Sequence, residues 1–100
     1  MKTVRFLAAA RCELRAEVLF YSEARSGLGV KFTQAVEHTL AIAARFPLAG
    51  SPGPAGTRKL RIKGFPFSVV YLPEDARIVV VAIAHHARHP EYWVNRVGRG

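Results

Sequence analysis

The last third of the chain holds the feature that most constrains its fold, two apolar runs separated by only five residues. The runs span Phe67 to Leu72 and Ile78 to Ala84 and are rich in valine and isoleucine, residues that favour strands. The connection between them, Pro73 to Arg77, has the length of a hairpin loop. Because the second run contains no polar residue, it predicts a central strand covered on both faces.

Two predicted helices supply that cover. Apolar residues recur at helical spacing from Ala9 to about Arg25. One face of this first helix would consist of Ala10, Leu14, Val18 and Tyr21. The second helix carries the strongest periodic pattern in the chain, formed by Phe32, Ala35, Val36, Thr39, Leu40 and Ala43. It should end at or just after Phe46, because Pro47 disfavours helical geometry in the residue before it.

The remaining segments join the helices and the hairpin into one predicted α+β domain spanning residues 1–100. Thr3 to Leu7 is typical of a short strand, and Ser26 to Gly29 of a connection between helices. Leu48 to Gly56, rich in proline and glycine, is interpreted as a mobile or functional loop. Thr57 to Gly64 predicts another strand. The expected order is β-α-α-β-β-β, with the helical hairpin packed on one face of an antiparallel sheet and a short C-terminal segment.

Composition narrows the possible partners and compartments. The net charge of +8 predicts attraction to nucleic acid, to anionic lipid or to an acidic protein. Cys12 is the only cysteine, so no intrachain disulfide can form. Arg5 and Arg11 leave an apolar core of only five residues near the N-terminus, too short for a secretion signal or a membrane span. We therefore expect a soluble cytoplasmic protein without a membrane partner.

Basic side chains alternate with apolar ones along the strand predicted at Thr57 to Gly64. Leu60 and Ile62 would face the core, which places three cations on the opposite face: Lys59, Arg61 and Lys63. These cations could bind phosphates or dock acidic side chains of an antagonist protein. The alternative interpretation is a solvated outer face on which lysine discourages pairing with other strand edges.

A second group of candidate binding residues follows the apolar hairpin, comprising His85, His86, Arg88, His89, Tyr92 and Arg96. The histidines do not predict a metal site, because no acidic residue lies between them and Cys12 is distant in sequence. We expect them to form hydrogen bonds at the end of the strand, and we expect no cofactor. Trp93 should fold back onto the core, whereas Tyr92 should be more exposed.

The order of elements and two segments resemble the RelE/ParE superfamily of bacterial type II toxins. The segments are RKLRIKGFPFSVVY, residues 58–71, and AIAHHARHPEYWVNR, residues 82–96. The second segment, with the pattern His-x-x-Arg-x-Pro-x-Tyr-Trp, is similar to the ParE-like branch. This resemblance implies a toxin that poisons DNA gyrase by binding, without making or breaking a bond. It also implies a cognate acidic antitoxin that wraps and inactivates the domain.

The RelE-type branch of the superfamily cuts mRNA on the ribosome and implies a different set of residues. Its arginine before the end of the third strand, and its arginine and tyrosine after the last strand, correspond here to Ser68, Ala87 and Trp93. None of these supplies a cation or a phenol. A metal-independent endoribonuclease remains an alternative. In it, an acid and a base would come from the histidines at 85, 86 and 89, and a phosphate would be held by Arg61, Lys63 or Arg88. A non-toxic basic binding module is a third possibility.

Overall fold

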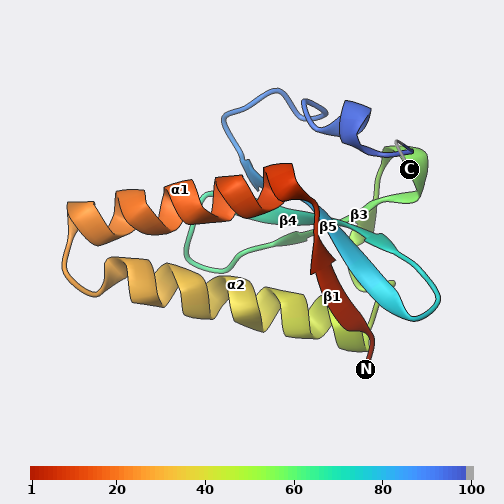
Figure 1. Ribbon diagram of the computed structural model, residues 1–100, viewed down its shortest axis with the longest axis horizontal. Coiled ribbons are helices and arrows are strands. Elements are labelled where there is room, and N and C mark those ends of the chain that lie inside the picture. The colour runs from red at the N-terminus through yellow and green to blue at the C-terminus, as the bar shows by residue number, and fades with distance from the viewer. Residues whose placement is uncertain (99–100) are drawn as a thin grey trace.

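The computed structural model describes residues 1–98 and shows two antiparallel helices beside a five-stranded sheet (Figure 1). The helices are α1 (Ala8–Ala24) and α2 (Leu28–Arg45). The strands are β1 (Thr3–Phe6), β2 (Ser51–Pro52), β3 (Arg58–Arg61), β4 (Phe67–Pro73) and β5 (Arg77–His85). Two short 3-10 turns, η1 (Pro54–Gly56) and η2 (Val94–Arg96), complete the structure. The predicted α+β class and element order are confirmed, with the two-residue β2 added.

The strands lie in the order β1-β5-β4-β3-β2, so β5 has a neighbour on each side. All neighbours are antiparallel except β1 and β5, which pair in parallel from Thr3–Arg77 to Phe6–Val80. The sheet is therefore mixed, and the expectation of a wholly antiparallel sheet is corrected at its first strand. Side-chain alternation in β1 carries no information on direction. The long connection that a parallel pair requires is present here, because both helices and three strands lie between β1 and β5 in the sequence.

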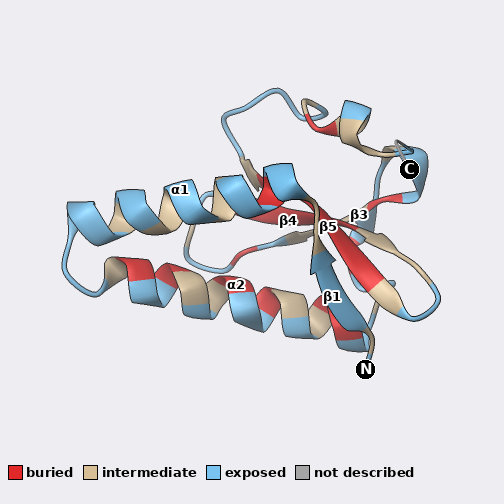
Figure 2. Ribbon diagram, viewed as in Figure 1, coloured by how far each residue is buried: buried red, intermediate tan, exposed pale blue. Residues whose placement is uncertain are grey.

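One face of the sheet is closed by the helix hairpin through apolar packing. The residues predicted to face inward from the two helices are buried or partly buried, and they pack on alternate residues of β4 and β5. The fully buried side chains of this face include Phe32, Phe67, Val69, Tyr71, Ile78 and Val80. The helices approach closely at Gly29, where a Cβ would lie 2.9 Å from the carbonyl oxygen of Val18. Figure 2 shows this burial along one side of α2 and along β5.

The opposite face of the sheet is partly covered by the C-terminal segment, residues 86–98, which follows β5. Val70, Val81, Ala82 and Trp93 form a smaller buried cluster on this side. Trp93 is only 4% exposed, and Tyr92 is partly exposed, as the sequence predicted. The run in β5 is thus covered on both faces, which its lack of polar residues also predicted.

The loop after α2 is held to the sheet by two side chains. The hydroxyl of Tyr71 donates to the Pro47 carbonyl at 2.8 Å and accepts from the Gly50 N–H at 3.0 Å. The guanidinium of Arg58 donates to the carbonyls of Leu48 and Gly50 at 3.2 and 3.0 Å. The first residues of the loop that the sequence indicates as mobile or functional, Leu48 to Gly56, thus have backbone groups bonded to the sheet.

Candidate binding groove

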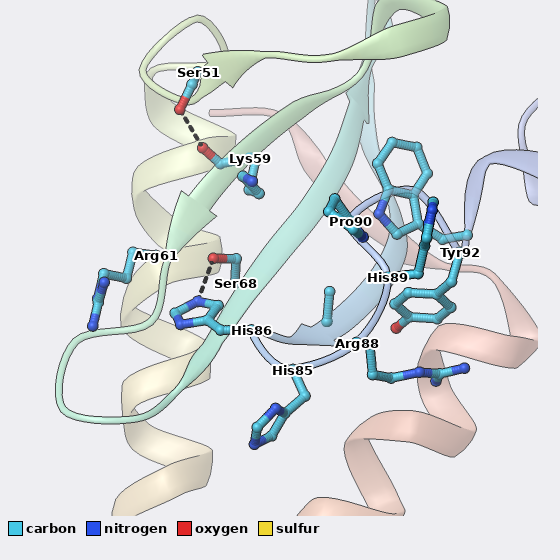
Figure 3. A pocket seen from close by; sticks show the side chains of 12 residues that line it. Ser51, Lys59, Arg61, Ser68, His85, His86, Arg88, His89, Pro90 and Tyr92 are labelled. Carbon is cyan, nitrogen blue, oxygen red and sulfur yellow. Dashed lines mark hydrogen bonds between the residues drawn. The ribbon is translucent and has the colours of Figure 1, made fainter.

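A groove of about 400 Å³ lies on the face of the sheet opposite the helices (Figure 3). Its floor is the cross-strand pair of Ser68 in β4 and Ala84 in β5, and Ser68 pairs on its other side with Arg61 of β3. Because serine and alanine have small side chains, they leave a depression in the part of the sheet surface that Trp93 does not cover. One wall consists of Lys59 and Arg61 from β3, which lie on the same face because they are two residues apart. The other wall is the turn that follows β5.

The groove is lined by basic side chains and by no acidic one among the described residues. Its full lining is Ser51, Lys59, Arg61, Ser68, Ala84, His85, His86, Arg88, His89, Pro90, Tyr92 and Trp93. Three of these carry permanent positive charge, and three are histidines. Positive charges gathered in a concave surface produce a stronger local potential than the same charges on a flat surface. The groove therefore favours an anionic ligand.

The three histidines are fixed by hydrogen bonds of their own, the role that the sequence led us to expect. Ser68 Oγ and His86 Nε2 share a hydrogen bond of 2.9 Å. His85 Nδ1 and His89 Nδ1 accept from the N–H groups of Ala87 and Glu91 at 2.9 and 3.3 Å. Burial lowers the pKa of His86 below 6.5, and the nearby charge of Arg61 lowers it further. His86 is therefore mainly neutral at pH 7.

Glu13 of α1 anchors the turn and the C-terminal segment, a role that the sequence did not reveal. Its carboxylate accepts from the Tyr92 hydroxyl at 2.7 Å and from the Arg96 guanidinium at 2.9 and 3.0 Å. It also accepts from the Ile83 N–H at 3.1 Å and lies 3.5 Å from Arg88. The partners of Glu13 are thus 70 or more positions away in sequence, so no local spacing could have indicated them.

This network also gives hydrogen-bond partners to backbone groups on the edge of β5, in the part of that strand that β1 does not reach. β1 ends at Phe6, which pairs with Val80, and α1 then begins. Beyond that point the N–H of Ile83 donates to Glu13, and the carbonyl of Val81 accepts from Arg96 at 3.0 Å. Val81 is skipped in the pairing between β5 and β4, because Val70 of β4 pairs with Ala82 and Tyr71 pairs with Val80. Such a bulge explains why the Val81 carbonyl is available to Arg96.

The electrostatics of the network favour a charged Glu13. Burial alone would raise the pKa of Glu13, but the hydrogen bonds from Arg96, Tyr92 and Ile83 outweigh it, and the net shift is downward. Burial raises the pKa of Tyr92 to about 12, assisted by its hydrogen bond to Glu13. The bond to Glu13 also raises the pKa of Arg96. Across the neutral range the carboxylate and the guanidinium are charged, and the phenol keeps its proton.

The structure brings together seven of the nine candidate residues named from the sequence: Lys59, Arg61, His85, His86, Arg88, His89 and Tyr92. Lys63 does not line the groove, because β3 ends at Arg61 and the chain turns through Gly64 at a φ of 87°. Arg96 lies on another side of the C-terminal segment and lines a second hollow of about 370 Å³, together with Leu7 and Val79. The floor residues Ser68 and Ala84 were not identified as part of a binding surface.

Within residues 1–98, no three histidine, cysteine or acidic side chains are grouped so that they could hold a metal ion. In the same part of the chain, neither helix combines the length and the apolar character needed to cross a membrane.

Comparison with known proteins identifies the family. A family model described as the ParE toxin of the type II toxin-antitoxin system parDE matches residues 4–90. A solved structure of the chromosomal ParDE system from P. aeruginosa superimposes with a TM-score of 0.69 at 20% identity, over 85% of this chain and 96% of that chain, which supports the fold. The search of curated proteins found no match. Since the family model matches most of its length, this chain belongs to the ParE toxin family of type II toxin-antitoxin systems.

Proposed function

We propose that this ParE-family toxin arrests growth by binding DNA gyrase in its complex with DNA, and that the binding groove is the surface it uses. The observation that carries this proposal is the lining of the groove, with six basic side chains and no acidic one among the described residues. A cationic concave surface accelerates association with a negatively charged assembly and orients it. The toxin would act in the cytoplasm, by binding alone.

The geometry of the groove supports inhibition by binding over cleavage. Cutting RNA at a 2′-hydroxyl requires a base, a cation at the phosphate and an acid for the leaving oxygen. At the positions that the RelE-type resemblance assigns to this chemistry stand Ser68, Ala87 and Trp93. Ser68 is buried and bonded to His86, and Trp93 packs in the core cluster beneath the C-terminal segment. Neither can contribute a positive charge.

A supercoiling assay tests this proposal directly. Purified toxin titrated into gyrase from its native host should block supercoiling and accumulate cleaved DNA. The double variant Lys59→Ala/Arg61→Ala should need a higher concentration for the same effect. Its matched control is Arg15→Ala/Lys31→Ala, which removes two exposed cations from the helices and leaves the groove intact. Normal supercoiling at saturating wild-type toxin would contradict the proposal.

One observation favours a second candidate, a metal-independent endoribonuclease acting on mRNA. His86 has a lowered pKa, so its imidazole can accept a proton at neutral pH, and in the groove it is hydrogen-bonded to Ser68 (Figure 3). Transcript mapping during growth arrest distinguishes this candidate from gyrase inhibition. Cleaved transcripts that disappear in His86→Ala, or in the equivalent variants of His85 and His89, would support it. Intact transcripts would exclude it, and harmless overexpression would instead support a non-toxic binding module.

We further propose that a cognate acidic antitoxin neutralises this toxin. The family is that of a toxin-antitoxin system, and the net charge of +8 is complementary to an acidic partner. Charge complementarity mainly raises the association rate and makes it sensitive to salt. Association measured between 50 and 500 mM salt should therefore slow markedly while dissociation changes little. An association rate that is independent of salt would argue against this electrostatic recognition.

A further inference from the structure

The shape and charge of the groove indicate which part of a gyrase–DNA complex it contacts. We propose that the binding groove holds an unpaired nucleic-acid strand, with basic side chains on its phosphodiester backbone and a planar side-chain pair against a base. This inference rests on the proposed function, because it names the DNA rather than the gyrase protein as the ligand of the groove.

The floor and the β3 wall fit a phosphodiester backbone. Ser68 and Ala84 are small, so they leave room for a chain to lie across the sheet, and the exposed His86, bonded to the buried Ser68 hydroxyl, provides a polar group beside that floor. Lys59 and Arg61 project on the same side, about 7 Å apart along the strand because the rise is about 3.3 Å per residue. Two cations spaced in this way can contact successive phosphates of one strand.

Arg88 and Tyr92 form a planar platform at the edge of the opposite wall, where the Arg88 side chain extends toward α1 (Figure 3). The Arg88 guanidinium lies 3.6 Å from the centre of the Tyr92 ring, and the arginine side chain is 55% exposed. Glu13 holds this pair, accepting from the Tyr92 hydroxyl and lying 3.5 Å from Arg88. Unpaired bases stack on arginine planes and aromatic rings in single-strand binding proteins. An acidic peptide would use the cations but has no base to place on this platform, so the platform favours nucleic acid.

The size of the groove favours a single strand over a duplex. Its volume of about 400 Å³ is at the lower end of the range of small-ligand sites. The backbone and one base of an unpaired strand can enter such a hollow. A duplex is too wide to enter and would touch only the rim of the groove.

Fluorescence anisotropy with labelled 12-nucleotide probes tests the inference on the purified full chain. Single-stranded DNA should bind more tightly than duplex DNA of the same sequence. The logarithm of its affinity should fall with the logarithm of salt concentration with a slope of about −1.4, as expected for the two cations, Lys59 and Arg61, that contact phosphates of a single strand. Lys59→Ala/Arg61→Ala should weaken binding about tenfold at 50 mM salt and reduce the slope by about 1.4. Arg15→Ala/Lys31→Ala, which removes the same charge elsewhere, should change the affinity less than twofold.

The variant Arg88→Lys tests the stacking of a base, and polyglutamate tests whether an acidic peptide can replace the nucleic acid. Arg88→Lys keeps the charge but removes the plane, so it should weaken single-strand binding severalfold without changing the salt slope. Polyglutamate should compete poorly at equal charge. Preferential binding of duplex DNA, equal loss in the control variant, displacement by polyglutamate as effective as by DNA, or no binding at low salt would each overturn the inference.

Two further comparisons are needed. The first distinguishes DNA from RNA as the ligand of the groove, and the second distinguishes a failure of this inference from a failure of the proposed function. An RNA probe of the same sequence should bind no more tightly than the DNA probe, and a strong preference for RNA would overturn the assignment to DNA. The same variants are then used in the supercoiling assay. If the groove variant loses single-strand binding but still blocks gyrase, the inference fails and the proposed function stands. If the wild type binds the strand without affecting gyrase, the proposed function fails and strand binding is supported.

Discussion

The two faces of the sheet are covered in different ways, although the same two strands form the middle of both. The helix hairpin closes one face with interlocking aromatic and aliphatic side chains, among them Phe32, Phe67 and Tyr71. The C-terminal segment closes part of the other face with one large apolar anchor, Trp93, and with polar bonds that converge on Glu13. Apolar packing supplies most of the stability on the first face, and directed hydrogen bonds fix the geometry on the second.

This difference explains why the groove lies where it does. A face filled by apolar side chains leaves no concave polar surface, because protein interiors pack to crystal-like density. Polar anchors allow the C-terminal segment to stand beside the small residues Ser68 and Ala84, of which Ala84 stays partly exposed. The cost is that the groove wall depends on a few bonds, so its integrity should respond to single substitutions and to pH, whereas the helix-covered face should respond to lost volume.

The largest expected effect is on the helix-covered face. Phe32 is fully buried, and the centroid of its ring lies 5.1 Å from the ring centroid of Tyr21 and 5.0 Å from that of Phe65. Phe32→Ala should reduce the free energy of unfolding by about 3–5 kcal/mol, measured by urea denaturation. Phe20→Ala on α1 is the matched control, because Phe20 is 60% exposed and should cost less than about 1 kcal/mol. Similar losses in the two variants would show that the helix hairpin does not close this face as described.

A smaller effect is expected from the anchor of the opposite face. Glu13→Gln removes the charge that Arg96, Tyr92 and Ile83 share, and should cost about 2 kcal/mol, typical of hydrogen bonds to a charged group. Glu23→Gln on the exposed end of α1 should cost almost nothing. Hydrogen exchange should show loss of protection concentrated in β5 and the C-terminal segment. Uniform loss throughout the helices would argue against a local anchor.

The elements of the helix-covered face were predictable because their signals are periodic and local. The face of α2 from Phe32 to Ala43, the end of that helix before Pro47 and the β4–β5 hairpin follow from spacing alone. The parallel direction of β1 and the two-residue β2 were not predicted, since four or fewer residues with alternating side chains fit either direction. The direction of β1 depends on the position of β5, more than 70 residues later, whereas β2 is too short to give a periodic signal.

The groove was predictable only in part, for the same reason. Alternation in β3 indicated that Lys59 and Arg61 share a face, and the cluster after β5 stood out by its composition. Their meeting across Ser68 and Ala84 requires the register of three strands. No local pattern singles out Glu13 among the acidic residues of the chain. Only the fold shows that it lies beside Tyr92 and Arg96.

A third prediction compares how the two variants, Glu13→Gln and Phe32→Ala, affect the free energy of unfolding as the pH is lowered. The pKa of Glu13 is lowered in the folded state, so its contribution to stability is complete above about 4.5, its ordinary value, and is lost as the pH falls below it. The difference in unfolding free energy between wild type and Glu13→Gln should therefore shrink from pH 6 to pH 3. The difference between wild type and Phe32→Ala should change little, because an apolar contact does not titrate. A wild-type–Glu13→Gln difference that stays constant over this range would contradict the lowered pKa.

The smallest expected effect concerns the groove itself and is read from one imidazole. NMR titration should give His86 a pKa below 6.5, because burial and the charge of Arg61 both disfavour the imidazolium. His85 and Lys59 act in the same direction, and a hydrogen bond to the backbone of Phe67 opposes them. Arg61→Ala should therefore raise the His86 pKa, whereas Lys31→Ala on α2 should leave it unchanged. If Arg61→Ala has no effect, Arg61 and His86 are not close enough to act on one anion, and the two walls of the groove would have to be treated as separate surfaces.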